Sequence, residues 1–496
     1  MGWLLASGGA LRSTQVFAED SSASKNAAAQ WRVLSRLGYG ITPALLESVR
    51  AANHPRDWAL QQLDAAYQAS QTAPYIEADL ADINQALPQI FAGAAKERQA
   101  RAAIKANTDT KAAANAEADP GRRFDFSSAP DAMYFNRTMI QKTTAWRLQI
   151  SSNPALENPV LARMTEFWFN HLNVYIGKGP VRPFVGHYVI NVARAHALGK
   201  FEDLLLASAH HPAMLFYLDQ WQSVATGSRN PQGNARGLNE NYARELMELH
   251  TLGVDGGYTQ TDVRELARVL TGWTVGPQDS TGFRFAQRFH DTDRKVVLGI
   301  SYPEGIFSAG VEEGEHAIRA LARHPSTAHR IALRLAQFFV ADAPSPALVR
   351  QLSTVFLQTG GDLREVMRAL VASPDFWAAD NRLFKTPLDF ALSALTATQA
   401  AMERKNLVLT AGFLNGAGQP LHGWQTPDGY KTDAATWLAP EALTRRADYA
   451  LALGRQSSSL EHLMPFLSTA TRDAIAQERA ALHAGLVLAS PDFMYK

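Results

Sequence analysis

The feature that most constrains the fold is the helical spacing of apolar residues, which recurs along almost the whole chain. In residues 161–174, LARMTEFWFNHLNV, the residues that share one face of the predicted helix are Leu161, Met164, Trp168 and Leu172. Aromatic residues occupy much of the remaining surface, and a helix that is apolar nearly all round is buried. Only residues 280–299, STGFRFAQRFHDTDRKVVLG, alternate apolar and polar residues as a strand does. We therefore predict an all-α fold, a large multi-helix domain with a minor β-hairpin.

The first residues predict export. Residues 1–18 contain a short apolar run and then Val16-Phe17-Ala18, which places small residues where a signal peptidase reads them. The basic region that normally begins such a signal is missing and Arg12 interrupts the apolar run, so two alternatives are a truncated signal whose true start lies upstream and a disordered leader. The prediction is a periplasmic or secreted protein, and no later run approaches the roughly 20 apolar residues of a membrane span.

The rest of the chain predicts a single domain. Residues 19–28 form a leader, and residues 29–496 form one large helical domain. Residues 93–121 are rich in Ala, Lys, Arg and Glu with little apolar periodicity, which predicts a charged insertion that is either a solvated helix or a mobile segment. Helix signals inside the domain are clear: Thr42-Pro43 is a helix start, Thr259 and Asp262 form a predicted cap, and Ala-Ser-Pro-Asp-Phe occurs twice as a helix stop.

Composition excludes several classes of function. The chain has no cysteine, which removes disulfides, thiolate metal sites and a cysteine nucleophile. The charges of its 48 basic and 47 acidic residues nearly cancel, so the net charge does not indicate a nucleic-acid partner. Walker, dinucleotide-binding and G-x-S-x-G motifs are absent from the sequence. We predict no bound cofactor.

A metal site is not predicted either. Di-iron sites in helical bundles need Glu-x-x-His, and neither Glu166 with His171 nor Glu245 with His250 has that spacing. The segment that begins at Asp255 resembles a calcium loop, but the twelfth position is Leu266, where a bidentate Glu is required.

Residues 239–250, NENYARELMELH, carry many polar groups on a short helical pattern. At about 100° per residue, Tyr242 and Leu246 share the buried face, and Glu240, Arg244 and Glu248 lie opposite in a run typical of solvated ion pairs. Glu245 and His250 fall on the flanks of the buried face, where a pKa can be moved. They are the better candidates for chemistry, although a Glu and a His that only satisfy core hydrogen bonds fit equally well.

The helix predicted at 161–174 shows a similar arrangement. Arg163, Glu166 and Asn170 form a narrow polar stripe with aromatic walls. Such a stripe faces either a polar cleft, as for a sugar, or the polar groups of another helix, and core packing is the commoner reason.

Several long segments resemble a bacterial family known as domain of unknown function eighteen hundred. They include NENYARELMELHTLGVDGGYTQTDVRELARVLTGWTV, MTEFWFNHLNV and AHHPAMLFYLDQ, and the resemblance runs from about Ala29 to the end of the chain. It implies an exported, mostly helical protein, often encoded beside a sulfatase-like partner, and it implies no reaction. Gly186-His187-Tyr188 departs from the family's Tyr-Glu-Arg pattern, so no role is carried over for that segment.

Two function hypotheses remain. The first is an enzyme that cleaves an envelope or extracellular polysaccharide, a hydrolase with Glu166 and Glu245 as paired carboxylates or a lyase using amide, His and Tyr groups. Its candidate catalytic residues are Glu166, His171, Glu245 and His250. Its candidate substrate-binding residues are Arg163, Asn170, Asn241, Tyr242, Arg244, His290 and Asp291. The second hypothesis is a non-catalytic binding or assembly partner of an exported sulfatase-like protein, in which these residues are internal fixtures.

The two hypotheses predict different surroundings for the polar residues. An open cleft that holds Glu166, Glu245 and His290-Asp291 favours the enzyme. A sealed and fully paired network favours the assembly partner. In both cases we expect Glu166, Asn170, Glu245 and His250 to converge.

Overall fold

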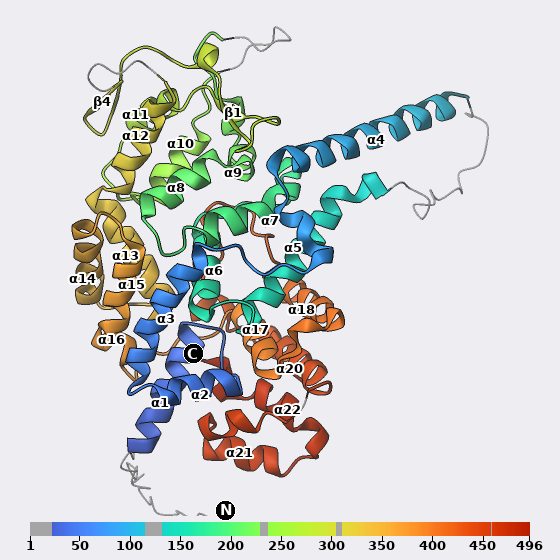
Figure 1. Cartoon of the computed structure of the whole chain (residues 1–496), viewed down its shortest axis with the longest axis vertical. Coiled ribbons are helices and arrows are strands. Elements are labelled where there is room, and N and C mark those ends of the chain that lie inside the picture. The colour runs from blue at the N-terminus through green and yellow to red at the C-terminus, as the bar shows by residue number, and fades with distance from the viewer. Residues whose placement is uncertain (1–21, 115–130, 229–236, 304–309, 458) are drawn as a thin grey trace, which may run out of the picture.

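Helices make up nearly all of the regular structure in the computed structural model of the protein (Figure 1). The structure describes residues 22–114, 131–228, 237–303, 310–457 and 459–496. The all-α prediction is confirmed. The predicted export signal at 1–18 lies outside the described residues, as do the first residues of the 19–28 leader and the end of the 93–121 insertion.

The α-helices of the first half of the chain are α1 (Ser22–Arg36), α2 (Pro43–Ala51), α3 (Pro55–Ser70), α4 (Leu87–Ala114), α5 (Phe135–Ser152), α6 (Pro159–His171), α7 (Val185–Tyr188), α8 (Phe201–His210), α9 (Pro212–Tyr217) and α10 (Asn241–Glu245). Those of the second half are α11 (Gln260–Val269), α12 (Val311–Ala322), α13 (Pro325–Phe339), α14 (Pro346–Gln358), α15 (Leu363–Ala372), α16 (Pro374–Trp377), α17 (Pro387–Thr398), α18 (Arg404–Gly416), α19 (Ala434–Trp437), α20 (Pro440–Gly454), α21 (Thr469–Ala476) and α22 (Ala480–Ala489).

Shorter helical segments connect these helices. The 3-10 segments are η1 (Ala78–Asn84), η3 (Asp131–Tyr134), η4 (Gly179–Phe184), η6 (Gln220–Gln222), η8 (Gln287–Phe289), η9 (Ala400–Met402), η10 (Glu461–Phe466) and η11 (Pro491–Met494). Two π-helical segments are η5 (Val189–Arg194) and η7 (Leu246–His250).

The predicted helix signals operate as local hydrogen bonds. The side chain of Thr42, the residue before Pro43, accepts a hydrogen bond from the Leu45 N–H at the start of α2. Thr259 and Asp262 form a complete capping box at the start of α11. In the repeated Ser-Pro-Asp-Phe, the hydroxyls of Ser373 and Ser490 each cap the short helix that follows.

The strands form two hairpins where the sequence predicted one. Strand β1 (Trp273–Val275) pairs antiparallel with β2 (Phe283–Phe285), and β3 (Lys295–Val297) pairs antiparallel with β4 (Ile300–Tyr302). The alternating stretch at 280–299 contains β2 and β3, but each pairs with a strand that lies outside or at the edge of that stretch. Alternation predicted extended backbone correctly and left the pairing open.

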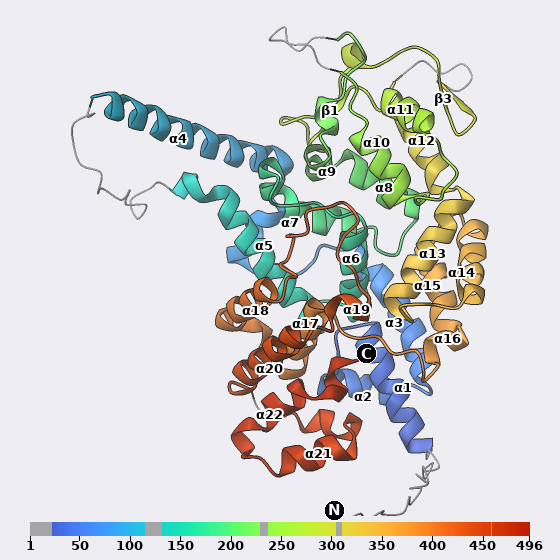
Figure 2. The same cartoon turned by 180° about the vertical axis from the view of Figure 1, so that it is seen from behind.

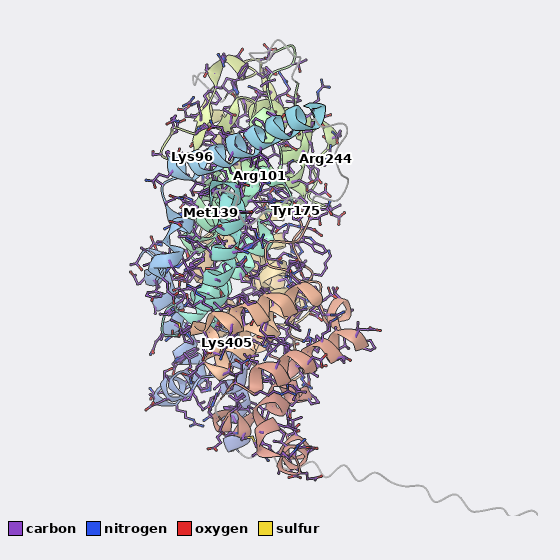
Figure 3. The ribbon with its side chains drawn as sticks, turned by 90° about the vertical axis from the view of Figure 1, so that its right-hand side faces the viewer. Lys96, Arg101, Met139, Tyr175, Arg244 and Lys405 are labelled. Carbon is purple, nitrogen blue, oxygen red and sulfur yellow. The ribbon has the colours of Figure 1, made fainter. Side chains whose placement is uncertain are left out.

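Helix α4 projects from the body as an arm (Figures 1 and 2). Its base packs on α5 and η4, and Figure 3 labels Lys96 and Arg101 along it. Buried Glu97 joins the base to the next segment, since it binds Arg101 on one oxygen and accepts the Asn136 N–H on the other, at 2.7 Å each. The charged composition predicted at 93–121 therefore belongs largely to one exposed helix.

The core centres on α6, which packs against α3, α5 and the π-helical η5. Helices α13, α14 and α15 pack side by side on one flank, and α17, α18, α20 and α22 form the other (Figure 2). In α6 the only positions that are not buried are Pro159, Thr165 and Glu166. Within the described ranges, no helix has the length and apolar character needed to cross a membrane.

Candidate functional site

Arg163 of α6 lies at the centre of a buried ionic triad. Its Nη1 pairs with Oδ1 of Asp389 on α17, and the Lys496 ammonium pairs with Oδ2 of the same carboxylate. Arg163 has no solvent exposure, and its guanidinium lies over the Phe338 ring at 4.4 Å. Burial would raise the pKa of Asp389, but Arg163 and Lys496 hold that pKa far below its usual range. The predicted substrate-binding Arg163 therefore anchors α6 to α17.

Glu166 is paired inside the fold. Its Oε2 binds the Arg147 guanidinium from α5, which also lies over the Phe169 ring at 4.4 Å. The side chain of Glu166 is only 15% exposed. The pair neutralises both charges where α5 meets α6, so it holds two helices together.

Asn170 clamps the loop between α18 and α19, residues 417–433, which we call the docked loop. The Asn170 amide donates to the Tyr430 carbonyl at 2.9 Å, and its oxygen accepts the Tyr430 N–H at 2.8 Å. Gly429 has a φ of +72°, and a Cβ there would lie 2.0 Å from the Asn170 carbonyl oxygen. Only glycine permits this approach. In Figure 2 the docked loop is the thin orange connection that runs beside α6.

Asn173 and Tyr217 complete the clamp. The Asn173 amide donates to the carbonyls of Trp424 and Thr426 at 3.1 and 2.9 Å. The Tyr217 hydroxyl, from α9, donates to the Gln425 carbonyl at 2.7 Å. Three side chains from helices far away in sequence thus fix the backbone of the docked loop.

His171 and His250 meet in the interior. The His171 Nε2 lies 3.1 Å from the His250 carbonyl oxygen, and because a carbonyl only accepts, His171 must carry its proton on Nε2. Burial lowers the pKa of His171 well below its usual value, helped by Arg334 and Arg330. Burial, with Arg330, also lowers the pKa of His250 to about 3. Both rings are neutral at physiological pH, which is unlike a general base poised near 7.

Glu245 stands at a helix irregularity. It ends α10, and the next five residues form the π-helical η7. Single-turn π segments are rare and frequently mark functional sites. The extra residue in the turn rotates the positions after Glu245, so His250 is fully buried where a regular α-helix would place it on a flank.

The Glu245 carboxyl is half-buried and forms no hydrogen bond or ion pair with the residues that the structure describes. Burial raises its pKa, the negative charges of Glu248 and Asp428 raise it further, and Arg244 only partly opposes them. Arg244 itself is engaged with Gln260 at 2.9 Å and with Glu240 at 3.4 Å.

Asp428 brings a second carboxyl from the docked loop. It accepts hydrogen bonds from Trp424 Nε1 at 2.9 Å and Thr426 Oγ1 at 2.6 Å, and Lys431 lies 3.5 Å away. Burial alone would raise the pKa of Asp428, but these hydrogen bonds and Lys431 outweigh it and lower that pKa. The two carboxyl groups interact, and their surroundings move their pKa values in opposite directions.

Arg334 of α13 adds a cation to this pair. Its guanidinium makes no hydrogen bond or ion pair with any described residue, and burial lowers its pKa while Asp428 opposes that shift. Its neighbour Arg330 donates to the Leu249 carbonyl at 2.9 Å. Both carboxyl groups also act on Tyr217. Burial is the main cause that raises the pKa of its hydroxyl, and the negative charges of Glu245 and Asp428 raise that pKa further. We call Glu245, Asp428, Arg334 and Tyr217 the carboxyl cluster.

The remaining predicted residues of α10 are structural. The Asn241 amide donates to the Leu218 carbonyl at 3.3 Å. Tyr242 is 1% exposed, and burial raises its pKa. Together with the paired Arg244, these side chains hold α10 in place.

His290 and Asp291 belong to a different cluster, between the hairpins and α12. His290 contacts the Thr271 carbonyl at 2.9 Å and the buried Glu313 carboxylate at 3.0 Å. Asp291 pairs with Arg268 at 2.8 Å. Across the described part of the chain, no group of three or more His, Asp or Glu side chains is arranged to hold a metal ion.

The structure therefore brings Asn170 to the docked loop and His171 to His250, while Glu166 pairs with Arg147. Glu245 forms no hydrogen bond or ion pair with any of the described residues. Sequence reasoning missed Asp428 and Arg334. The sequence did hold a signal for Asp428. Residues 424–430 contain two aromatic residues and a Thr-Pro-Asp-Gly turn in a connection between helices, where functional residues are common. Arg334 sits in an ordinary amphipathic helix, and nothing local distinguishes it.

One protein family matches over nearly the whole length. Residues 32–495 match the family described as Protein of unknown function (DUF1800). The chain belongs to this family. The match spans α6, α10, α13 and the docked loop, so the carboxyl cluster lies inside the family's domain. No curated protein and no solved structure matches the chain.

Proposed function

We propose that this DUF1800 protein is an exported hydrolase or lyase that cleaves an envelope or extracellular polysaccharide, with Glu245 and Asp428 as its reacting carboxyl groups. The carrying observation is that the charge of Asp428, on the docked loop, acts on Glu245, and that the pKa values of the two carboxyl groups are displaced in opposite directions. Pairs of carboxyl groups driven apart in this way supply one acid and one base. Glu166, paired with Arg147, is replaced by Asp428 in this assignment.

The charge states define the roles. Glu245, whose raised pKa favours its protonated form, donates its proton to the glycosidic oxygen as the bond from that oxygen to the sugar breaks. Asp428, held ionised, takes the proton of an attacking water or forms the new bond to the anomeric carbon itself. In a lyase reaction Asp428 would remove the proton next to a uronate carboxylate, which the unpaired Arg334 would neutralise.

Aromatic rings beside the carboxyl cluster support a sugar ligand. Trp424 and Tyr430 of the docked loop have ring centroids 4.8 Å apart and are both partly exposed. Tyr175 is also partly exposed and interacts electrostatically with Tyr217 and Tyr430. An aromatic face with a polar edge suits a sugar ring, which is apolar on its faces and polar at its rim.

The test is cleavage of a panel of envelope and extracellular polysaccharides, read by mass spectrometry. Wild-type protein should yield fragments whose summed mass exceeds that of the parent by one water per cut for a hydrolase and equals it for a lyase. Glu245→Gln and Asp428→Asn should each lower turnover by about two or more orders of magnitude. The melting temperature of Glu245→Gln should stay near that of the wild type.

Glu166→Gln is the matched control because it makes the same chemical change in the paired carboxylate. It should lower the melting temperature while the folded fraction keeps its turnover. The absence of cleavage by the wild type across the panel, or full activity in Glu245→Gln, would overturn the proposal.

A non-catalytic role as assembly partner of an exported sulfatase-like protein is the second candidate. The observation that favours it is the sealed network of α6, where Arg163, Glu166 and Asn170 are all engaged in internal contacts. Co-purification of wild type and Glu245→Gln with such a partner at equal yield, without polysaccharide cleavage, would favour this role.

A further inference from the structure

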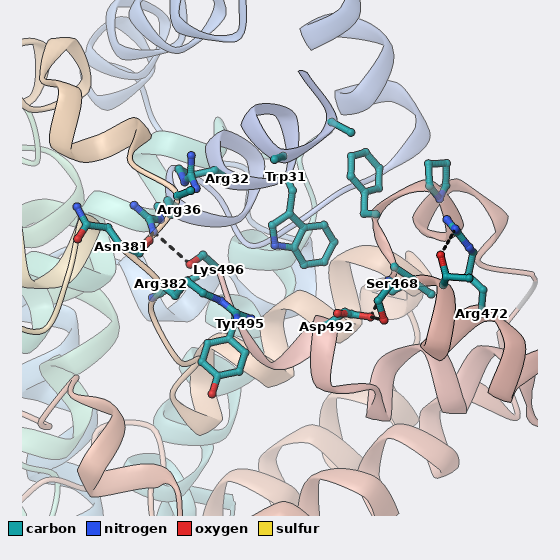
Figure 4. A pocket seen from close by; sticks show the side chains of 17 residues that line it. Trp31, Arg32, Arg36, Asn381, Arg382, Ser468, Arg472, Asp492, Tyr495 and Lys496 are labelled. Carbon is teal, nitrogen blue, oxygen red and sulfur yellow. Dashed lines mark hydrogen bonds between the residues drawn. The ribbon is translucent and has the colours of Figure 1, made fainter. Parts of the chain in front are cut away.

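A cavity of about 760 Å³ lies at the opposite end of the molecule from the hairpins. Helix α1, the connection between α16 and α17, the segment from η10 to α21, and the last residues of the chain enclose it (Figure 4). This volume is in the range of small-molecule sites. None of its lining residues belongs to the carboxyl cluster.

The lining is strongly cationic. The cationic side chains are Arg32, Arg36, Arg382, Arg472 and Lys496. Asp492 is the only acidic side chain among the described lining residues, and it accepts hydrogen bonds from the Ser468 N–H at 2.9 Å and the Thr471 hydroxyl at 2.6 Å. Lys496 pairs with Asp389, which also pairs with Arg163. The four arginines therefore leave a net positive charge facing the space.

Arg36 is the most deeply buried of the four arginines that line the cavity. It is 1% exposed, and its Nη atoms donate to the main-chain oxygens of Phe376 at 3.2 Å, of Asn381, and of the last residue, Lys496, at 3.5 Å (Figure 4). Its Nε has no hydrogen-bond partner in the described structure. Burial and the neighbouring Arg32 lower the pKa of Arg36 to about 9. A buried guanidinium without a side-chain carboxylate partner is unfavourable, and an oxyanion in the cavity would compensate its charge.

Arg32 lies one helical turn before Arg36, on the same face of α1. Its Nη1 donates to the Trp377 carbonyl, and no side-chain carboxylate of the described chain pairs with either guanidinium. Figure 4 shows Arg32, Arg36 and Arg382 at one end of the cavity and Arg472 at the other. Guanidinium groups bind oxyanions through paired N–H donors, which favours them over lysine for this purpose.

Between the two cationic ends lies an aromatic wall. The Trp31 ring lies 5.7 Å from the Phe466 ring, and both line the cavity. The Arg382 guanidinium lies 4.2 Å from the Tyr495 ring centroid. The space is much larger than one inorganic phosphate needs, and the wall offers contact to an apolar or aromatic body.

We propose that this cavity binds an organic oxyanion, with its phosphate, sulfate or carboxylate at Arg32 and Arg36 and its organic body against Trp31 and Phe466. The site lies apart from the carboxyl cluster, so a ligand there is a second ligand of the protein. The proposal does not depend on the proposed polysaccharide cleavage.

The test uses phenyl phosphate as probe, in isothermal titration calorimetry with the full-length protein. Phenyl phosphate should bind, and its affinity should fall as salt is added. Phenol keeps the ring without the charge, and inorganic phosphate keeps the charge without the ring. Both should bind at least tenfold more weakly than phenyl phosphate.

Arg32→Gln is the informative variant, since Arg36→Gln also removes contacts that hold three backbone carbonyls. Arg32 is partly exposed, so Arg32→Gln should keep its melting temperature and weaken phenyl phosphate binding at least tenfold. Arg350→Gln, an exposed charge on α14, is the control and should bind as the wild type does. No binding of phenyl phosphate, equal binding by the two variants, or equal affinity for inorganic phosphate would overturn the proposal.

Discussion

Helix α6 and the carboxyl cluster use the same kinds of side chain in opposite ways. In α6, each polar side chain of the predicted stripe has a partner: Arg163 has Asp389, Glu166 has Arg147 and Asn170 has Tyr430. In the cluster, Glu245 and Arg334 have no hydrogen-bond or ion-pair partner within the described ranges. The docked loop is linked to both regions, because Asn170 binds its Tyr430 and the charge of its Asp428 acts on Glu245.

The difference separates architecture from chemistry. A buried charge that is paired keeps one protonation state and contributes to the packing of the helices that carry it. A half-buried carboxyl without a partner can change its protonation state at little structural cost, which acid–base chemistry requires. A polar stripe on a buried helix is thus a weaker sign of function than a polar group beside a helix irregularity.

The largest expected effect is on the α6 side, from Asp389→Asn. The substitution leaves Arg163 and Lys496 buried without a counter-charge, so the free energy of unfolding should fall by about 3–5 kcal/mol. Because the folded-state pKa of Asp389 lies below its ordinary value of 3.8, this stabilisation is present above that value and is lost as the pH falls further. Urea unfolding at several pH values measures both effects.

Asp473→Asn, on the exposed face of α21, is the control for that measurement and should change the stability by less than about 0.5 kcal/mol. A loss from Asp389→Asn no greater than from this control would show that the triad contributes nothing to the fold.

A smaller loss should follow from Glu166→Gln. The amide keeps one hydrogen bond to Arg147 but removes the charge, and the free energy of unfolding should fall by about 2 kcal/mol. The same change at Glu245 should have almost no effect, so the two variants compare the regions directly by urea unfolding. Equal losses at both positions would remove the contrast between them.

Asn170→Ala should loosen the docked loop. It removes two hydrogen bonds to Tyr430 and should lower stability by about 1–2 kcal/mol. Amide hydrogen exchange should become faster at Tyr430 in particular, and turnover should fall because Asp428 is carried by the same loop. Asn415→Ala, exposed on α18 just before the loop, should leave exchange at Tyr430 unchanged.

The smallest effect is the pH dependence of Glu245→Gln. The pKa of Glu245 is raised in the folded protein, so its ionisation opposes folding once the pH exceeds the ordinary Glu value of 4.5. At pH 7 the variant should be as stable as the wild type or slightly more so, within about 0.5 kcal/mol, and the difference should vanish well below pH 4.5. A variant that is clearly less stable at pH 7 would place Glu245 with the paired residues of α6.

Much of the fold was predictable because its signals are local. Thr42-Pro43, the Thr259–Asp262 box and the Ser-Pro-Asp-Phe stops act within four residues, and each is confirmed as a cap. The helical wheel of residues 239–250 failed after Glu245, because a π turn cannot be recognised from apolar spacing. Alternation found β2 and β3 but could not give their partners. The export signal at 1–18 stays a prediction.

The sequence by itself determined the fold class, the burial of α6 and the family, since periodicity and long motifs are properties of contiguous residues. Only the tertiary structure decided which polar groups are paired. Arg147 reaches Glu166 through the packing of α5 on α6, and Asp428 reaches Glu245 through a loop that three distant side chains clamp. The pKa of a carboxyl depends on burial and on the charges within a few ångströms, and those neighbours come from any part of the chain. For that reason Glu245 could be predicted as a candidate catalytic residue from the sequence, whereas Asp428 and Arg334 were recognised only in the structure.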